Sequence, residues 1–155
     1  MKRKLIHVTA IAMALTSSAA AQIDDSGKCG NEMLKGAYGT QLSGTRPAPF
    51  VPPGKPGFAG QMEQVSGIVI QVFDSKGSFT QTDNLKGAIS GFVPDRPGRG
   101  TYVVNPDCSM IQTVQPAPGV TIVTRSVILD GGKEIRGFTV SPDEVNLTIL
   151  ARPIK

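Results

Sequence analysis

Residues 120–140 decide the fold class, and they read VTIVTRSVILDGGKEIRGFTV. The two flanking runs, 120–129 and 134–140, are rich in the β-branched residues Val, Ile and Thr, which favour strands. Between them the tetrapeptide DGGK supplies the glycines that a tight hairpin turn needs for positive φ angles. The segment therefore predicts two antiparallel strands joined by a short turn.

Short strand-forming runs and turns continue on both sides of this hairpin. The chain contains 18 glycines and 12 prolines, and it has few helix signals. Six further strands are expected, at 34–43, 65–73, 78–85, 99–104, 108–114 and 145–152. Irregular structure is expected at 45–62, 87–98 and 115–119, because these stretches are rich in Pro or Gly and proline cannot donate a ladder hydrogen bond. The sequence thus predicts an all-β protein with about eight strands.

The connections between the expected strands indicate how the strands pair. Nearly all of them are short after residue 65, so consecutive strands should pair antiparallel as a meander. An open meander has two unpaired edges, and closure into a barrel removes them. An eight-stranded barrel is either filled by side chains or holds one small ligand. We therefore expect an eight-stranded antiparallel meander barrel, with a two-sheet β-sandwich as the alternative.

Residues 1–21 have the pattern of a secretory signal peptide. Lys2, Arg3 and Lys4 precede a short apolar run, and three alanines end the segment. The run is too short for a stable membrane anchor, which takes about 20 residues. Cleavage would leave residues 22–155 as a single domain with no further membrane span, exported to the periplasm or the medium.

Loss of this leader changes the charge and the available chemistry. It removes three cations, so the net charge of +4 falls to about +1, and the remaining Lys and Arg are scattered. Nucleic-acid binding is therefore not expected. The single histidine, His7, leaves as well, and the chain has no Trp. The absence of histidine from residues 22–155 excludes serine–histidine and cysteine–histidine catalysis and histidine-ligated zinc.

Cys29 and Cys108 are the only two cysteines. In an oxidising compartment such a pair normally closes. Redox-active pairs usually lie close together as Cys-x-x-Cys, and these two lie far apart. A structural disulfide is expected, with two free thiols as the alternative.

Two segments contain candidate ligand-binding residues. Arg96 and Arg99 lie in a glycine-rich stretch that could hold an anionic group at a barrel mouth, although a solvated turn is the simpler interpretation. The proline-rich loop 45–62 contains Phe50 and Phe58. We expect these rings to pack on the barrel wall or mouth rather than to bind a partner protein.

The acidic residues form no recognisable active-site pattern. Asp74, Asp107, Asp130 and Asp143 fall in expected turns, where Asp caps its own backbone. Sequence spacing does not identify a glycosidase pair, and calcium-loop and nucleotide-binding motifs are absent. We therefore predict no catalytic residue, no metal and no cofactor.

Residues 68–70 read IVI, so both faces of their strand are apolar. One face of a barrel strand is exposed to solvent, and exposed apolar side chains on that face are expected to be buried by another part of the protein or by a partner. Either the proline-rich loop or a second copy of the chain is expected to provide it, which makes a homo-oligomer one expectation.

The segment 100–109, GTYVVNPDCS, resembles a motif of small secreted bacterial proteins of unknown function. These proteins combine it with an early cysteine, a Leu-x-Gly-x-Tyr-Gly opening and a Phe-Asp-x-x-Gly hairpin, which correspond to Cys29, 34–39 and 73–77. That group resembles the calycin-like barrels, particularly the allene oxide cyclase barrel. The resemblance implies an eight-stranded barrel with an apolar cavity, often oligomeric, and it carries no catalytic residue onto this chain.

Three functions follow as hypotheses, and the first is favoured. The first is a secreted, non-catalytic barrel that binds a small apolar or amphipathic molecule. The second is a structural or interaction protein of the cell surface or periplasm. The third is an isomerase of the allene oxide cyclase type. An isomerase of that kind would need a buried Glu or Tyr facing the cavity, for which Tyr38, Tyr102 and Glu63 are candidates. The expected ligand-binding residues are Tyr38, Phe50, Phe58, Arg96, Arg99 and Tyr102.

Overall fold

The computed structural model describes residues 28–48 and 60–155. The expected signal peptide, Phe50 and Phe58 lie outside these residues. The described part is all-β, as predicted, apart from the short 3-10 turns η1 (Asn31–Met33) and η3 (Asp130–Gly132).

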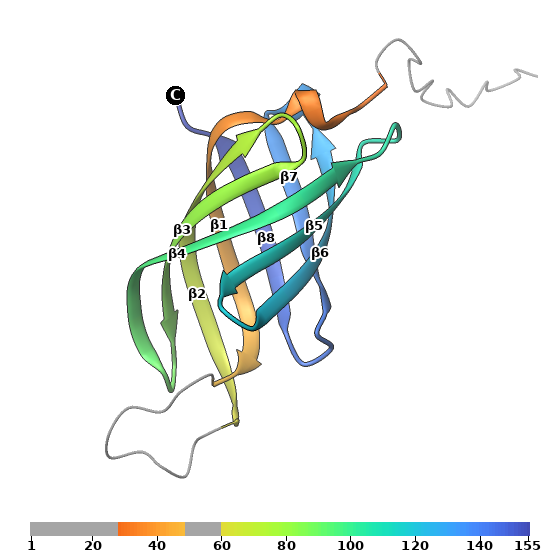
Figure 1. The fold of residues 1–155 in the computed structure, drawn as a ribbon. Helices are drawn as coiled ribbons and strands as arrows, with labels where there is room; N and C mark the ends of the chain where they lie inside the picture. Colours follow the sequence, from red (N-terminus) through yellow and green to blue (C-terminus); the bar gives the residue numbers. More distant parts are fainter. Residues whose placement is uncertain (1–27, 49–59) are drawn as a thin grey trace, which may run out of the picture.

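Eight antiparallel strands form a closed barrel in the order of the chain (Figure 1). The strands are β1 (Lys35–Pro47), β2 (Met62–Asp74), β3 (Ser78–Gly87), β4 (Gly91–Val104), β5 (Ser109–Ala117), β6 (Val120–Leu129), β7 (Glu134–Ser141) and β8 (Asn146–Pro153). Pairing of β1 with β8, from Tyr38↔Pro153 to Thr45↔Asn146, closes the ring. The predicted meander barrel is confirmed, and the β-sandwich alternative is wrong.

The expected irregular stretch at 87–98 is wrong, because β4 begins at Gly91. Its first half pairs only with β3, since pairing with β5 starts at Arg99. Pro94 and Pro97 therefore lie where the strand has a neighbour on one side, and proline is tolerated at such an edge.

Two other expected breaks are shorter than predicted. β1 runs to Pro47 and β2 starts at Met62, so both strands take residues from the expected loop 45–62. β5 continues to Ala117 because a register shift after Val114 accommodates Pro116.

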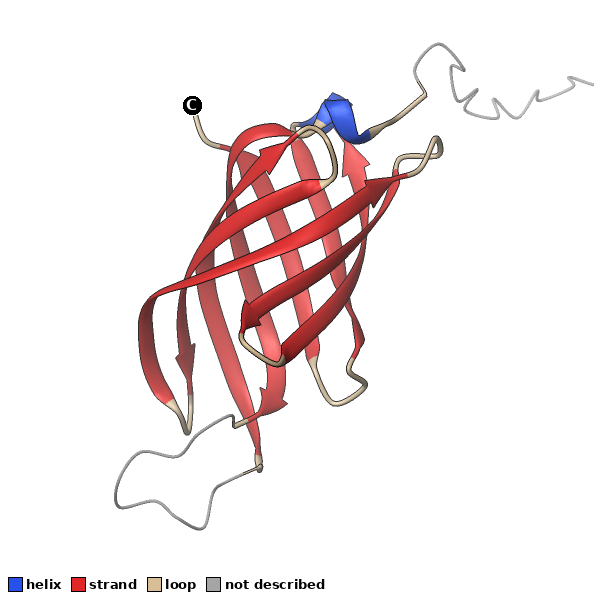
Figure 2. Cartoon of the chain, viewed as in Figure 1, coloured by secondary structure: helices blue, strands red, loops and turns tan. Residues whose placement is uncertain are grey.

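One end of the barrel is filled by an aromatic cluster beneath η1, the helical turn at the top of Figure 2. Phe73 lies at the centre of this cluster, with ring centroids 5.2 Å from Tyr38, 5.4 Å from Phe79 and 5.1 Å from Tyr102. The Tyr38 and Tyr102 contacts are edge-on, an arrangement that aromatic pairs favour. Met110, Ile128 and Ile135 complete the packing of this half of the interior, and each is at most 5% exposed.

The predicted disulfide between Cys29 and Cys108 is confirmed, with a Cα–Cα distance of 5.0 Å. It ties the segment before β1 to the turn between β4 and β5. In the same segment Asn31 Oδ1 accepts a hydrogen bond of 2.8 Å from the Val104 amide. These links hold the N-terminal segment across the filled end of the barrel.

Candidate functional site

A cavity of about 300 Å³ occupies the other half of the barrel. Its lining comes from all eight strands, and it reaches the end at which β1 stops and the β5–β6 and β7–β8 turns lie. Pro47, Pro116, Pro142 and Glu144 mark that end. The aromatic cluster forms the opposite limit, so the cavity has one accessible end among the residues that the structure describes.

The wall of the cavity is mainly apolar. Strand periodicity turns alternate side chains inward, and on β3 the buried side chains are those of Phe79, Gln81, Asp83 and Leu85. Leu85 packs with Val65 and Leu147 near the open end. The remaining apolar lining residues are Leu42, Val69, Val114, Val120, Ile122, Val145 and Ile149.

A chain of hydrogen bonds crosses the middle of the barrel, between the aromatic cluster and the apolar wall. The Thr40 hydroxyl donates to Gln71 Oε1 (3.1 Å), Gln71 Nε2 donates to Gln81 Oε1 (3.3 Å), and Gln81 Nε2 donates to Asp83 Oδ2 (3.3 Å). Arg96 closes the chain with two bonds of 3.0 Å to the Asp83 carboxylate. We call these five residues the polar belt.

Strand register explains why the belt forms. Gln71 pairs directly with Gln81 across β2 and β3, and Asp83 pairs directly with Arg96 across β3 and β4. Cross-strand partners that point inward lie within reach of one another. Asp83 is only 2% exposed, and its bidentate hydrogen bonds with the Arg96 guanidinium compensate for the hydration that the carboxylate loses on burial.

Gln112 lines the same cavity from β5 and is 3% exposed. Its Oε1 accepts a hydrogen bond of 3.3 Å from Thr124, its direct cross-strand neighbour. Its Nε2 has no hydrogen-bond partner within residues 28–48 and 60–155. A buried N–H group without an acceptor lowers the stability of the protein, so a ligand or a water is expected to accept a hydrogen bond from this atom.

The candidate residues named from the sequence separate in space. Arg96 lines the cavity, whereas Tyr38 and Tyr102 lie in the aromatic cluster and do not line it. The Tyr38 hydroxyl donates to the Gly132 carbonyl (2.7 Å), and the Tyr102 hydroxyl donates to the Asn31 and Leu34 carbonyls. Burial raises the pKa of both phenols, which keeps them protonated as donors.

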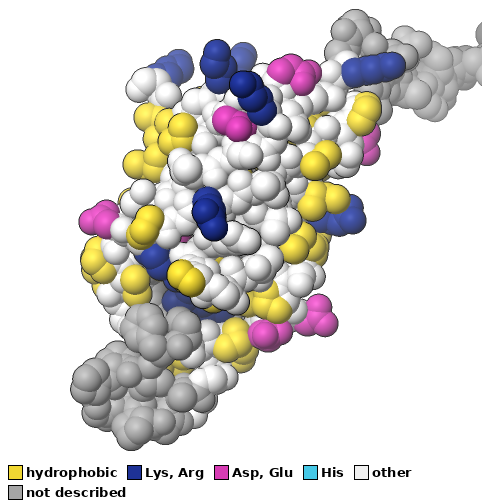
Figure 3. All heavy atoms as spheres, in the orientation of Figure 1, with side chains coloured by type: hydrophobic (Ala, Val, Ile, Leu, Met, Phe, Trp, Pro, Cys, Tyr) yellow, Lys and Arg dark blue, Asp and Glu magenta, His cyan; other side chains and the backbone are white. Residues whose placement is uncertain are grey.

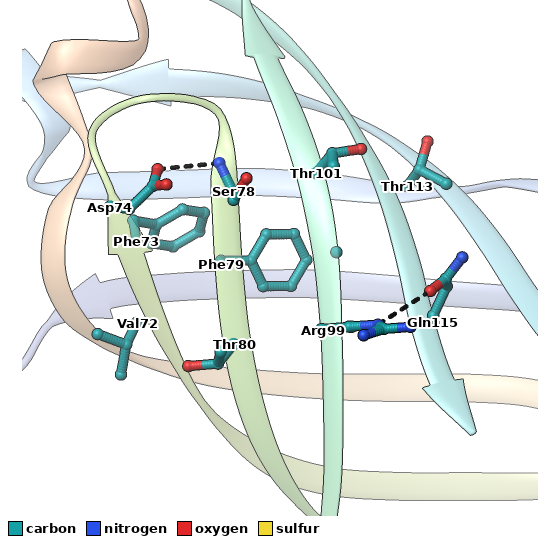
Figure 4. Close-up of a pocket in the computed structure, with 11 residues that line it drawn as sticks. Val72, Phe73, Asp74, Ser78, Phe79, Thr80, Arg99, Thr101, Thr113 and Gln115 are labelled. Carbon is teal, nitrogen blue, oxygen red and sulfur yellow. Dashed lines mark hydrogen bonds between the residues drawn. The ribbon is translucent and has the colours of Figure 1, made fainter. Parts of the chain in front are cut away.

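Arg99 lies on the outer wall, where its Nε donates to Gln115 Oε1 at 3.4 Å (Figure 4). These two side chains border a depression of about 620 Å³ over β2 to β5. Position 100 in its lining has to be glycine, because a Cβ there would collide with both the Phe79 ring and the Thr113 carbonyl oxygen. The depression is a shallow part of the outer surface, so it encloses a ligand less completely than the barrel interior does.

Sequence reasoning missed Gln71, Gln81, Asp83 and Gln112. The alternation of residues 78–85 could have revealed two of them. Phe79 and Leu85 are apolar and therefore face the barrel interior, and Gln81 and Asp83 lie at the alternate positions between them, on the same face of the strand. Polar residues on a buried phase point to a lined cavity or an internal network.

Glu63 is buried near the open end but does not line the cavity. Its carboxylate accepts hydrogen bonds from the Ser90 hydroxyl (2.8 Å), the Ser90 and Ile89 amides (2.9 and 3.0 Å) and Arg46 Nε (3.1 Å). Burial alone would raise the pKa of Glu63, but these donors together outweigh it and hold the pKa below its usual value.

This arrangement gives a pH prediction for Glu63→Gln. The contribution of Glu63 should be complete above the pKa of an unfolded Glu, about 4.3, and should disappear as the pH falls through the lower folded value. The variant should therefore be less stable than wild type near neutrality, and the gap should narrow below about pH 4. Urea midpoints across this pH range measure the gap, with Glu144→Gln as a control for loss of one exposed carboxylate. A gap independent of pH would contradict the prediction.

The outer face of β2 is apolar, as expected from residues 68–70. Ile68 and Ile70 are 66% and 51% exposed, so the described residues do not cover them. On the face that Figure 3 shows, hydrophobic side chains occur in several separate groups. A second subunit on β2 therefore stays a prediction.

No helix in the described part of the chain is long and apolar enough to cross a membrane. Within the same residues, no three His, Cys, Asp or Glu side chains gather as a metal site would require. In comparisons with known proteins, the chain matches no family model, no curated protein and no solved structure.

Proposed function

We propose that this protein binds one small, mainly apolar or amphipathic molecule inside its barrel and holds it without covalent chemistry. The observation that carries the proposal is the contrast between the two halves of the interior. One half is packed by aromatic and aliphatic side chains, and the other half holds a cavity of about 300 Å³ with an apolar wall and a polar belt.

The size of the cavity limits the size of the ligand. Ligand pockets usually measure about 300–1,000 Å³, so this cavity is at the small end. A cavity of about 150 Å³ takes one benzene, which suggests a molecule of about twelve non-hydrogen atoms. The apolar wall would bury the body of such a molecule, and the polar side chains that line the cavity would meet its polar end.

The state of the polar groups favours binding over catalysis. Asp83 is held by Arg96 and Gln81, and Glu63 is held by Arg46, Ser90 and the Ile89 amide. Both carboxylates already accept several hydrogen bonds from the protein, which disfavours either one as a general base. The two tyrosines considered for an isomerase lie in the aromatic cluster.

We further propose that the protein works outside the cytoplasm as a calycin-like binding protein. The Cys29–Cys108 bond supports this location, because structural disulfides persist in oxidising compartments. The closed eight-stranded meander supports the calycin-like comparison at the level of the fold.

Val69→Phe tests the proposal by filling the cavity. Val69 points inward and lines the cavity, so the larger ring should displace a ligand and weaken binding at least about tenfold, which corresponds to about 1.4 kcal/mol. The measurement is an NMR titration of the isotope-labelled protein with methyl hexyl ketone, a nine-heavy-atom probe.

Ile70→Phe is the matched control, because Ile70 is the next residue on the same strand and points outward at 51% exposure. It should bind the probe as wild type does. Failure of wild type to bind, or equal binding by both variants, would contradict the proposed function.

A further inference from the structure

The chemistry around Gln112 specifies which polar group the ligand carries. This inference rests on the proposed function, and it starts from the direction of the hydrogen bonds in the belt. An ionised carboxylate only accepts, so Asp83 requires Gln81 to present its amide nitrogen. That leaves Gln81 Oε1 to accept from Gln71 Nε2, and Gln71 Oε1 to accept from Thr40. The Asp83–Arg96 pair therefore sets the orientation of both amides.

Among the described residues, the one buried polar side-chain atom that lines the cavity and has no hydrogen-bond partner is a donor, Gln112 Nε2. A primary amide has two N–H groups, and Gln71 and Gln81 each use one of them within the belt. Gln112 uses neither among the described residues, while its oxygen already accepts from Thr124. Each of the three glutamine oxygens accepts one hydrogen bond, whereas the nitrogen of Gln112 makes none among the described residues. A complementary ligand must supply an acceptor.

The charges around the cavity disfavour an anionic acceptor. Two arginines line it, and each is already paired: Arg96 with Asp83 at 3.0 Å, and Arg46 with Glu63 at 3.1 Å. Glu144 adds a further negative charge at the open end. A carboxylate bound here would be desolvated with no cation left to pair with it, which is strongly unfavourable.

We infer that the ligand presents a neutral carbonyl-type oxygen to Gln112 Nε2, as a ketone, aldehyde, ester or amide would. Gln112 acts as the specificity-determining residue of the cavity. A second buried polar atom without a partner among the described residues, Ser126 Oγ, lies on the same inner wall, two residues beyond Thr124 on β6. It does not line the cavity, so the direct contact is assigned to Gln112 alone.

Three probes of similar size test the inference. Methyl hexyl ketone carries the carbonyl, the alkene with a methylene in place of the ketone oxygen keeps the shape without the acceptor, and octanoate adds a negative charge. Each is titrated by NMR into wild type, Gln112→Met and the outward-facing control Gln115→Met. Methionine matches the length of glutamine and removes the donor, and Gln115 lies on the same strand with an exposed side chain.

Gln112→Met should weaken ketone binding about three- to tenfold, the contribution of one neutral hydrogen bond, and leave alkene binding unchanged. Gln115→Met should change neither. Octanoate should bind wild type more weakly than the ketone. In wild type, the Gln112 side-chain amide resonance should shift with the ketone and not with the alkene, a readout that does not depend on the variant folding.

The outcomes separate the two proposals. If wild type binds none of the probes, the proposed function fails. If wild type binds ketone and alkene but Gln112→Met weakens both equally or neither, and the Gln112 amide responds to both alike, the carbonyl inference is overturned while the binding function stands. Tighter binding of octanoate than of ketone would overturn the neutral part of the inference.

Discussion

Replacing Cys29 and Cys108 together with alanine is expected to lower the free energy of unfolding by about 4 kcal/mol. The two residues are separated by 79 positions, and the chain-entropy relation gives about 4.5 kcal/mol for a closed loop of that length. The total stability of a domain is usually about 5–15 kcal/mol, so the variant should lose a large share of it. Urea unfolding followed by circular dichroism measures the change.

The position of the disulfide adds a second expectation. Cys29 is buried in the aromatic cluster, and the bond holds η1 across it. The double variant should therefore expose Tyr102 and Phe73 to local opening, seen as faster amide exchange at the filled end than at the cavity end. Wild type reduced under native conditions should behave like the variant. A change in stability below about 1 kcal/mol would show that the bond contributes little beyond the surrounding hydrogen bonds.

Arg96→Leu is expected to destabilise the protein by about 3 kcal/mol. The substitution leaves the 2%-exposed Asp83 without its cation, and breaking a buried pair from one side typically costs about 3–5 kcal/mol. We place the effect at the lower end because the Arg96 side chain itself is 24% exposed. Urea unfolding again gives the value.

Two companion variants identify the cause of the Arg96 effect. Arg99→Leu removes an exposed arginine from the same strand and should change stability by less than about 0.5 kcal/mol. The double variant Asp83→Leu with Arg96→Leu removes both charges and should be more stable than Arg96→Leu alone, since an apolar pair often replaces a buried ion pair at little cost. Equal losses for the two arginine variants would contradict the assigned role of Asp83.

The barrel could be predicted because its signals are local, and the disulfide because the chain has only two cysteines. The DGGK turn, the period-two alternation and the short connections each specify antiparallel neighbours, and two cysteines allow one pairing. The first half of β4 could not be predicted this way. Whether Pro94 and Pro97 interrupt a strand depends on how far β5 extends beside them, and that length is a property of the assembled sheet.

The candidate site was harder to predict because depth along the barrel axis depends on the register of all eight strands. Tyr38 and Tyr102 have suitable chemistry, but the register places them in the filled half. Gln71, Gln81 and Gln112 have an inward phase that the alternation could have revealed. That they line one cavity depends on cross-strand pairs such as Gln71↔Gln81 and Gln112↔Thr124, which only the folded sheet defines.

The filled aromatic half of the barrel affects how a carrier of this shape would exchange its cargo. If a ligand binds in the cavity, the filled half would block its passage from end to end, so entry and release would share one opening. The bound molecule would then have to leave before another could enter. Any donor or acceptor of the cargo would then have to approach the same pole of the molecule, one after the other.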